Sequence, residues 1–446
     1  MKRKLNIMVI HAIDQLAQSR PTTLRNLWAF EKHCDNARFY YHYFEDAISA
    51  ALCSIPFDVV ILDTTFLCMR WARPRSYFND VKAKYYWLAG SNAVILAFPQ
   101  DDYDHAHILD DWLADYGVAK VYSACPKYGD ILYPRMWKAG RVGHILTGYI
   151  DDDDISIYAS LQKSFEARGK DVGYRVRRLP PNFGAYGLLK SEFGRVFRRQ
   201  ASSRYIVDIS DDPKDTIVGE SWPAFLGDCR FALGCESGSG ILDVRGEIKD
   251  AVDAAIAQDP SPSAEQIVQA ISSTEVASRE FSAPSPRLFE IALAGCCPIL
   301  LEGDYLGLIR PEEHYISVKR DFSNIDTAVA RMIDVDAAKT IATRYRDAIL
   351  ANESLRYRSW AKRVYDEIAE EMLGGKEVGL LTDWEFHAAI ESHRSFLRAE
   401  YRKYHLPQVE SYKAELQRLQ KATNNSLYGR CMSFVGRRVG SIQRQV

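Results

Sequence analysis

The sequence predicts an α/β protein made of two Rossmann-like domains, each with a doubly wound parallel sheet. At 446 residues the chain is long for one core, which favours two domains plus an extension. A hydrophobic content of 47% and a charged content of 26% are typical of a soluble globular protein. Short apolar runs alternate with helical patterns, as in a parallel sheet covered by helices. We expect the first domain at residues 1–150, the second at 151–373 and a helical, basic extension at 374–446.

The first 150 residues supply the clearest alternation. Ligands of such sheets bind beyond the carboxyl ends of the strands, so residues 11–14, 63–65 and 99–103 are candidate walls of a cleft. Strands are expected at 5–10, 37–43, 57–62, 93–98, 119–122 and 143–146, with helices at 22–33, 77–88 and 105–116.

An acidic run, GYIDDDD at 148–154, follows the last of these strands. Asp152-x-Asp154 has the spacing of a metal-binding DxD motif, which in its own class follows a strand within a single domain. Here the run opens a helix after one domain ends, and acids at a helix start complement the helix dipole. We interpret it as a linker or helix cap.

The second domain is expected to begin near Lys170. The helix-rich stretch 337–373 would end it. Strands are expected at 174–177, 205–209, 231–234, 298–301 and 315–318, and helices at 249–257, 264–272, 287–294 and 325–333.

Residues 285–303, SPRLFEIALAGCCPILLEG, read as a helix that runs into a buried strand. Ser285 can cap the helix, Pro286 suits its first position, and Gly295 suits a left-handed C-terminal residue. Glu290 lies one turn inside, among apolar neighbours. A carboxylate there can accept two hydrogen bonds from a vicinal diol, while the helix N-terminus holds phosphates, a combination that fits a nucleotide. The alternative is that Glu290 only complements the helix dipole, worth about 0.3–1 kcal/mol.

Cations cluster in YRVRRLPPNFGAYGLLK, residues 174–190. Arg175, Arg177, Arg178 and Lys190 surround a Gly/Pro-rich loop at 180–187, a plausible phosphate clamp in which we favour Lys190 and Arg177. The alternative is a solvated strand edge protected by charge. Arg287, at the start of the Glu290 helix, is a further candidate for the phosphates.

The small-residue stretch CESGSG, residues 235–240, follows an expected strand. We read it as a loop that lets backbone N–H groups, including that of Gly238, approach a ligand. Glu236, Ser237 and Ser239 could bond sugar hydroxyls, and Asp243 could hold the loop instead of the ligand.

Candidate acid–base residues lie in the first domain. Asp101 and Asp102 of FPQDDY follow a strand, and either could activate an acceptor hydroxyl; a helix N-cap pair is the alternative. His11, after the first strand, is the other candidate, with a buried structural histidine as its alternative. We favour Asp102 over Asp101 and His11.

Taken together, these segments resemble the GT-B glycosyltransferases, and most closely the bacterial family 1/4-like branch associated with surface-polysaccharide genes. The resemblance rests on the Glu290 helix and on the matches at 98–103, 174–190, 207–210, 236–248 and 314–326, and spans roughly residues 90–370. It implies two domains facing across a cleft, a nucleotide sugar as donor substrate, no metal and no further cofactor. It also implies that 337–373 crosses back onto the first domain and that His314 and Tyr315 close the nucleotide pocket. One departure concerns the donor sugar, because Ser282 stands where many such enzymes have a second glutamate.

Charge and cysteine usage exclude several classes. A net charge of −2 argues against nucleic-acid binding, and the nine cysteines form no CxxC pair or His/Cys cluster, which points to a reducing compartment and no structural zinc. The apolar run near the N-terminus is short for a signal peptide, and no stretch approaches about 20 apolar residues, so we expect a cytoplasmic protein. Residues 401–446 carry nine Lys/Arg against two Glu. That tail could dock on the inner face of a membrane or on an acidic partner, or be a solvated tail or a subunit contact.

The sequence therefore predicts a cytoplasmic, metal-independent glycosyltransferase that moves a sugar from a nucleotide sugar to a polysaccharide, glycolipid or related acceptor. A sugar-nucleotide epimerase of the same fold is one alternative. A non-catalytic scaffold on a transferase-like fold is the other.

Overall fold

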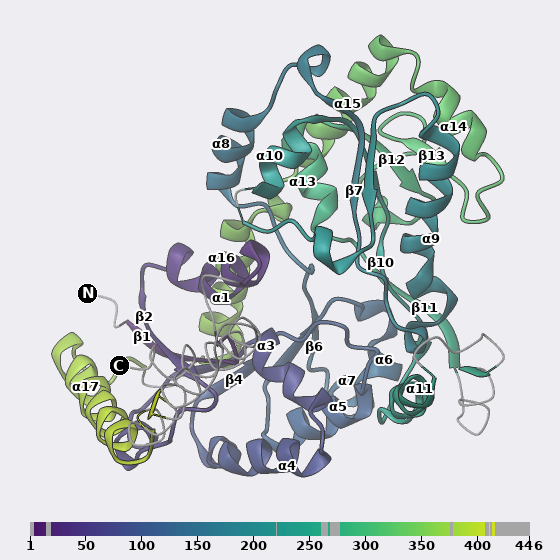
Figure 1. The fold of residues 1–446 in the computed structure, drawn as a ribbon. Helices are drawn as coiled ribbons and strands as arrows, with labels where there is room; N and C mark the ends of the chain where they lie inside the picture. Colours follow the sequence, from purple (N-terminus) through teal and green to yellow (C-terminus); the bar gives the residue numbers. More distant parts are fainter. Residues whose placement is uncertain are drawn as a thin grey trace.

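The computed structural model describes residues 4–14, 19–219, 221–259, 266–267, 277–374, 378–405, 410 and 413–414. Figure 1 shows two lobes, each built on a parallel sheet with helices on both faces. The predicted fold class is confirmed for the two sheets: two Rossmann-like α/β domains face each other across a cleft.

The first sheet has the strand order β2-β1-β3-β4-β5-β6, with all pairs parallel. Every residue of β1, β3 and β4 is buried, as expected for strands covered on both faces. Its strands are β1 (Leu5–His11), β2 (Ala37–Tyr43), β3 (Val59–Leu62), β4 (Val94–Ala97), β5 (Lys120–Ser123) and β6 (Val142–His144). Its helices are α1 (Pro21–His33), α2 (Ala50–Cys53), α3 (Thr64–Leu67), α4 (Arg75–Lys84), α5 (Ala106–Asp115), α6 (Gly129–Leu132) and α7 (Pro134–Lys138).

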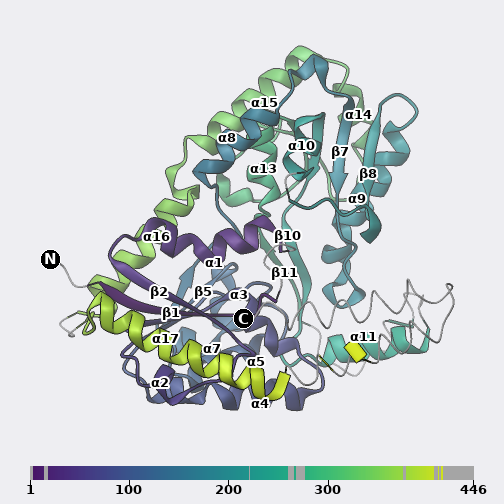
Figure 2. The ribbon, with the colours of Figure 1, turned by 60° about the vertical axis from the view of Figure 1, so that its left-hand side comes forward.

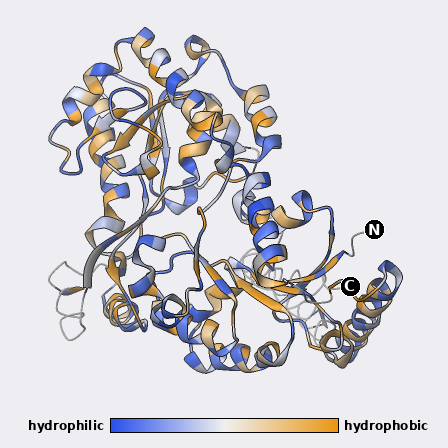
Figure 3. Cartoon of the chain, turned by 180° about the vertical axis from the view of Figure 1, so that it is seen from behind, coloured by the Kyte–Doolittle hydropathy of each residue, from blue (hydrophilic) through white to orange (hydrophobic). Residues whose placement is uncertain are grey.

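The second sheet has the order β13-β12-β9-β7-β8 and is also parallel. Figure 3 shows hydrophobic strands within helices whose outer faces are hydrophilic. Its strands are β7 (Lys170–Arg175), β8 (Val207–Ser210), β9 (Cys229–Gly234), β12 (Cys297–Leu301) and β13 (Ile316–Val318). Its helices are α8 (Asp152–Leu161), α9 (Gly184–Ala201), α10 (Ser221–Gly227), α13 (Arg287–Ala294), α14 (Ile325–Arg331) and α15 (Val335–Leu350).

A two-stranded antiparallel ribbon, β10 (Ser237–Leu242) and β11 (Ala277–Ala283), extends from the second domain. The helix α11 (Glu247–Gln258) follows β10 and lies beside the first domain in Figure 1. Asp104 and Asp243 form an isolated parallel bridge at this junction.

The two domains are also joined where the chain crosses between them. Ile150 and Arg356 form a parallel bridge, so the outgoing and returning segments are hydrogen-bonded side by side. The helix α16 (Tyr357–Glu367) then lies along α1, and the ring centroid of its Trp360 is 4.9 Å from that of Phe30 and 5.1 Å from that of Tyr149. The chain after the second sheet thus returns to the first domain, as the resemblance implies (Figure 2).

Beyond residue 374, α17 (Asp383–Glu400) packs against α2. The described helices include none that is both long and apolar enough to cross a membrane. The eight cysteines within the described ranges are free thiols. Most of the basic segment 401–446 lies outside the described residues, and the domain boundaries at 150 and 373 stay a prediction.

Strand prediction worked where apolar runs are uninterrupted. The strand β7 begins at Lys170 rather than at 174, because its charged start is neutralised by ion pairs: Lys170 with Asp228 at 3.0 Å and Asp171 with Arg230 at 2.5 Å. Two predicted loops are corrected. Residues 180–187 form a short turn and then the start of α9, and 237–240 belong to β10. The helix predicted at 264–272 lies almost entirely outside the described residues.

Candidate active-site cleft

A cavity of about 800 Å³ lies between the two domains and is lined by both. That size suits a nucleotide-sized ligand. From the first domain it is lined by Arg20–Asn26 except Leu24, Gln100–Tyr103, Ala124, Cys125 and Thr147. From the second it is lined by parts of α8, by residues around Arg177 and Lys190, by the 210–223 segment, by Cys235–Ser237 and by the start of α13.

The second sheet explains why the cavity opens at this edge. Its order reverses between β7 and β9, so the connections after these strands diverge to opposite sides. Ligands of open α/β sheets bind in the crevice at such a switch point. Arg177 follows β7 and Glu236 follows β9, and both line the cavity.

Glu290 lies in the first turn of α13 and lines the cavity. The Trp222 indole N–H donates to its Oε2 at 2.9 Å. Burial raises the pKa of the Glu290 carboxyl, while nearby Arg287 and the Trp222 hydrogen bond act in the opposite direction. The carboxylate is thus half-buried, held on one oxygen and exposed to the cavity.

The start of α13 differs in detail from the sequence prediction. The helix begins at Arg287, with Pro286 as its N-cap, and the Ser285 Oγ accepts only a long bond of 3.4 Å from the Arg287 N–H. The Leu288 and Phe289 N–H groups donate to the carbonyls of Ser285 and Pro286. Because these N–H groups are already bonded, the side chains rather than the backbone are left to bind an anion here. Gly295 ends the helix in the left-handed region, at φ 61°, as predicted.

Arg287 points into the cavity between two aromatic rings. Its guanidinium carbon is 5.0 Å from the Tyr174 ring centroid and 5.6 Å from that of Trp222. Its buried Nε has no hydrogen-bond partner among the described residues. The guanidinium is held by the two rings and keeps hydrogen-bond donors for a ligand.

Lys190, on α9, is the second cation of this wall. Its Nζ donates to the Ser237 Oγ at 2.9 Å. Burial lowers the pKa of Lys190, and the positive charges of Arg287 and Arg20 add to that effect. Asp101, from the opposite wall, acts in the other direction. Crowded cations of this kind favour an anionic ligand.

The two arginines of the β7 end have different surroundings. Arg177 is exposed and lines the cavity. Arg175 also lines it, but its guanidinium bonds Asp208 at 2.6 Å and the Asp215 carbonyl at 3.0 Å. Arg177 is therefore the better candidate for a ligand contact. Arg178 does not line the cavity.

The 236–238 segment is only partly as predicted. Glu236 and Ser237 line the cavity, with the Glu236 Oε1 accepting from the Tyr305 N–H at 3.0 Å. Gly238 does not line it, and a Cβ there would lie 1.8 Å from the Phe281 carbonyl oxygen. Glycine at 238 permits the close approach of β10 to β11, rather than that of a backbone to a ligand.

On the first-domain wall, Asp101 and Asp102 follow β4 and both line the cavity. Asp101 is exposed, has a left-handed φ of 51° and accepts from the Tyr103 hydroxyl at 2.5 Å. Asp102 is 1% exposed and accepts from the Ser123 hydroxyl at 2.5 Å. Burial raises the pKa of Asp102 to about 6.

This acidic loop is held by a buried arginine that sequence reasoning missed. Arg70 is 0% exposed and donates to the carbonyls of Gln100 at 2.8 Å, and of Asp101 and Asp104 at 3.0 Å. It also lowers the pKa of Asp102. No local pattern in the sequence marks Arg70, because the loop carbonyls that it holds lie about 30 residues away.

Three predicted contacts fall outside the cavity. His11 is buried at the end of β1, burial lowers its pKa to about 4, and its Nδ1 accepts from the Ile13 N–H at 3.3 Å. It is a structural histidine. His314 accepts from the Arg310 N–H at 3.0 Å, Tyr315 is buried, and neither residue lines the cavity.

The acidic run is a helix cap, as interpreted. The Asp151 carboxylate accepts from the Asp153 N–H, and α8 begins at Asp152. Asp152 pairs with Arg358 at 2.9 Å, and Asp154 pairs with Arg25. These carboxylates thus cap α8 and form ion pairs, and Asp154 also lines the cavity.

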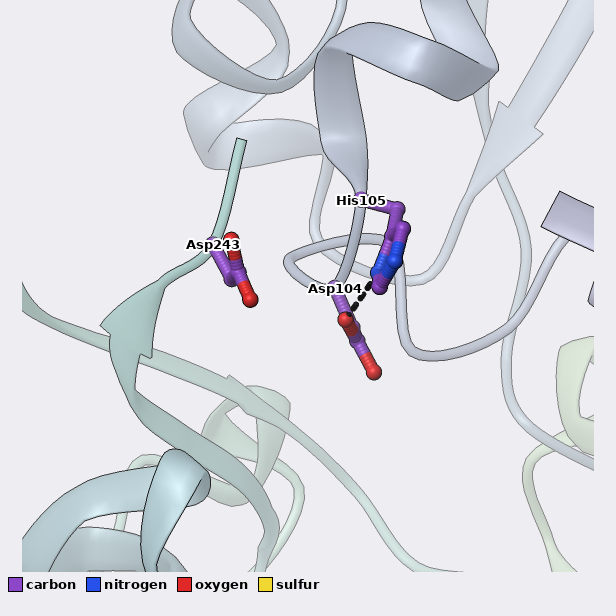
Figure 4. A group of neighbouring side chains, drawn as sticks. All are labelled: Asp104, His105 and Asp243. Atoms are coloured by element: carbon purple, nitrogen blue, oxygen red, sulfur yellow. Dashed lines mark hydrogen bonds and ion pairs between the residues drawn. The ribbon is translucent and has the colours of Figure 1, made fainter. Parts of the chain in front are cut away.

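A second polar cluster, Asp104, His105 and Asp243, joins the domains beside the cleft (Figure 4). The three residues are buried and have ligand types that metals use. His105 already contacts the Asp104 Oδ1 at 2.5 Å and Arg73 at 3.2 Å, while both Asp243 oxygens accept from backbone N–H groups. The Asp243 carbonyl accepts from the His105 N–H at 2.6 Å. We interpret the cluster as a hydrogen-bonded junction between the domains.

The structure thus brings most of the predicted side chains around one cavity: Asp101, Asp102, Arg177, Lys190, Glu236, Ser237, Ser285, Arg287 and Glu290. His11 and Gly238 lie elsewhere. Trp222, Arg20 and the 210–219 segment line the cavity without having been predicted. Arg20 is the residue directly before α1, which begins with Pro21. The proline marks the start of a helix in the sequence, so this local signal could have identified Arg20 as a candidate.

Comparison with known proteins gives likeness at the level of the fold. No family model matches the chain, and no curated protein matches its sequence. It is similar to HepE of Anabaena in complex with UDP-glucose, with 8% identity, a TM-score of 0.49, and coverage of 82% of this chain and 99% of that one. It is also similar to an α-glucosyltransferase in complex with UDP and a 13-mer DNA, with 9% identity, a TM-score of 0.47, and coverage of 82% and 100%. A third is sucrose-phosphate synthase from Thermosynechococcus elongatus, with 10% identity, a TM-score of 0.46, and coverage of 83% and 100%.

Proposed function

We propose that this protein is a glycosyltransferase that moves a sugar from a nucleotide sugar to an acceptor hydroxyl in the interdomain cleft. The observation that carries the proposal is the set of charged side chains that both domains bring to one cavity. Arg177, Lys190 and Arg287 line it from the second domain beside the carboxylates of Glu236 and Glu290, whereas the neighbouring Arg175 is paired with Asp208. Asp101 and Asp102 line it from the first domain.

In the proposed complex the second domain binds the donor. Glu290 accepts hydrogen bonds from the ribose hydroxyls, and Arg287, Lys190 and Arg177 hold the diphosphate. Glu236 and Ser237 lie at the end of β9 and face the donor sugar. When the glycosidic bond breaks, negative charge develops on the leaving diphosphate, and the three cations stabilise it without a metal ion.

The first domain binds the acceptor. A carboxylate of Asp102 or Asp101 accepts the proton of the attacking hydroxyl as the oxygen bonds to the anomeric carbon. A raised pKa makes Asp102 the better base near neutral pH, because it is ionised there yet basic enough to take a proton.

The acceptor and the cellular setting are also part of this proposal. We propose a polysaccharide, glycolipid or related acceptor, as the sequence resemblance implies. The free thiols fit a reducing, cytoplasmic setting. The basic 401–446 segment is the proposed contact with an inner membrane face or an acidic protein.

Product analysis tests the proposal. The chain is incubated with UDP- and GDP-sugars, with and without candidate acceptors, and the nucleotides and sugars are separated. Free UDP or GDP that forms only with acceptor supports a transferase. An isomerised nucleotide sugar identifies an epimerase, and the absence of both products with every donor points to a scaffold.

A further inference from the structure

Trp222 is an aromatic residue that contacts both Glu290 and Arg287 of the proposed nucleotide site. It lies on α10, which packs against α13 and α8, and its half-buried side chain lines the cavity. Its indole ring stacks on the buried Phe225 with centroids 5.5 Å apart and planes at 20°. The ring is thereby fixed from behind while its other side faces the cleft.

Two groups of the proposed site depend on this one side chain. The Trp222 Nε1–H donates to the Glu290 Oε2 at 2.9 Å. The Arg287 guanidinium carbon is 5.6 Å from the centroid of the Trp222 ring, on the side of the cavity where Glu290 lies. A carboxylate and a guanidinium are therefore oriented by the edge and the face of the same indole.

We propose that Trp222 is a positioning residue, which holds the Glu290 carboxyl turned to accept the ribose diol of a nucleotide and keeps Arg287 directed at the phosphates. This inference rests on the proposed function. The sequence alone does not indicate the Trp222–Glu290 hydrogen bond, because the two residues lie 68 positions apart.

The geometry leaves room for the ligand. An ionised carboxylate offers about four acceptor sites on two oxygens, and the indole uses one of them. The whole of Oε1 and a second site on Oε2 remain for two ribose hydroxyls. Trp222 consequently does not need to leave when a nucleotide binds.

The electrostatic surroundings make the hydrogen bond important. Burial raises the pKa of Glu290, which favours the uncharged acid. Arg287 on the same helix, and Arg25 and Arg20 at the start of α1, oppose that effect, as does the Trp222 N–H. Asp154 and Tyr158 of α8 face Glu290 from the remaining side. Loss of the indole donor removes one of the few groups that keep the carboxylate charged.

The experiment compares UDP binding by isothermal titration calorimetry between pH 5.5 and 8.5, with GDP as the probe if UDP does not bind. Trp222→Phe removes the N–H donor and keeps an aromatic ring. We expect 3- to 10-fold weaker binding at pH 7.5 and a loss of affinity on acidification that begins at higher pH than in the wild type. Titration of the nucleotide phosphate is common to all variants and cancels in the comparison.

Two further variants separate positioning from packing. Trp384→Phe, at a 78% exposed site on α17 outside the cavity, should bind as the wild type does. In a Glu290→Gln background, position 290 no longer titrates, so adding Trp222→Phe should leave the pH profile unchanged. Trp222→Phe with wild-type affinity and pH profile overturns the inference alone. A wild-type chain that binds neither nucleotide overturns the proposed function and, with it, this inference.

Discussion

The two walls of the cleft hold their charges in opposite ways. On the second-domain wall, Arg287 and Lys190 are supported by aromatic rings and a serine hydroxyl, with no carboxylate in ion-pair contact among the described residues. On the first-domain wall, the loop with Asp101 and Asp102 is pinned from behind by the fully buried Arg70. Arg287 and Lys190 thus remain available to a ligand, and Asp101 and Asp102 lie on a fixed loop. Both walls also carry groups of the opposite sign, Glu290 on the second and Arg20 on the first.

This difference indicates a division of labour. Unpaired cations gain most from an anionic ligand, because phosphate oxygens replace the protein partner that they lack. A buried carboxylate with a raised pKa gains most from taking a proton. The second wall is suited to binding the donor and the first to chemistry on the acceptor, so substitutions on the two walls should alter different measurements.

The largest effect is expected from Asp102→Asn. If Asp102 is the base, the turnover number should fall by about 10²- to 10⁴-fold, because an amide cannot take the proton. The dissociation constant for nucleotide should stay within twofold. In the wild type, activity should fall as the pH drops below about 6, where Asp102 becomes protonated and can no longer act as a base.

Asp101→Asn is the matched comparison for that experiment. A large loss in Asp101→Asn with little loss in Asp102→Asn would reassign the base to the exposed aspartate. Turnover within threefold of wild type in both variants would remove the acidic wall from the chemistry. Steady-state rates and calorimetry on the same preparations decide between these results.

The next effect concerns the support of that wall. Arg70→Met leaves the carbonyls of Gln100, Asp101 and Asp104 without their buried donor, and we expect the free energy of unfolding to fall by about 3 kcal/mol. Urea denaturation measures it. Arg310→Met, at an exposed arginine paired with Glu313, is the control and should unfold as the wild type does. Equal denaturation midpoints for Arg70→Met and the control would mean that Arg70 does not stabilise the loop at residues 100–104.

On the second wall, Glu290→Ala should weaken nucleotide binding by about 1.5–3 kcal/mol through the loss of charge-assisted hydrogen bonds. Turnover at saturating donor should change less than affinity does. Calorimetry checks the first statement and rates at high donor concentration check the second. Unchanged affinity in a folded Glu290→Ala protein would exclude Glu290 from the site.

The smallest effect is expected from Lys190→Met, which should weaken UDP binding by about 1 kcal/mol. The loss is small because Arg177 and Arg287 also bind the phosphates. Burial lowers the pKa of Lys190, and a bound diphosphate should raise it. UDP binding at alkaline pH should therefore take up protons, and Lys190→Met should reduce that uptake. Binding enthalpies in two buffers of different ionisation enthalpy measure it; equal uptake in both proteins would place Lys190 away from the phosphates.

The sequence was sufficient for most elements of both sheets and for much of the second wall. Buried parallel strands are short apolar runs, and α13 has a Pro before it and Gly295 after it, so the position of Glu290 follows from local rules. The cations of 175–190 could be linked to the same site because the ends of β7 and β9 lie at one edge of the sheet.

The remaining features depend on contacts that local patterns do not encode. Residues 237–240 of CESGSG form the start of β10 because they pair with β11, whose residues lie about 40 positions further on. Arg70 matters through three long-range hydrogen bonds to a loop, and Trp222 through one to a carboxylate. His11 follows a strand end as a ligand residue would, but burial beside Tyr43 makes it part of the core.

Thermal unfolding of the purified chain with UDP, GDP, CMP and their sugar conjugates, with and without a chelator, tests the central claim most directly. The account predicts that one nucleotide class raises Tm equally in both conditions, with about 2.7 kcal/mol of added stability at a hundred times its dissociation constant. A shift that disappears with chelator would contradict metal-independent binding. No shift with any nucleotide would contradict the donor site itself and favour a scaffold.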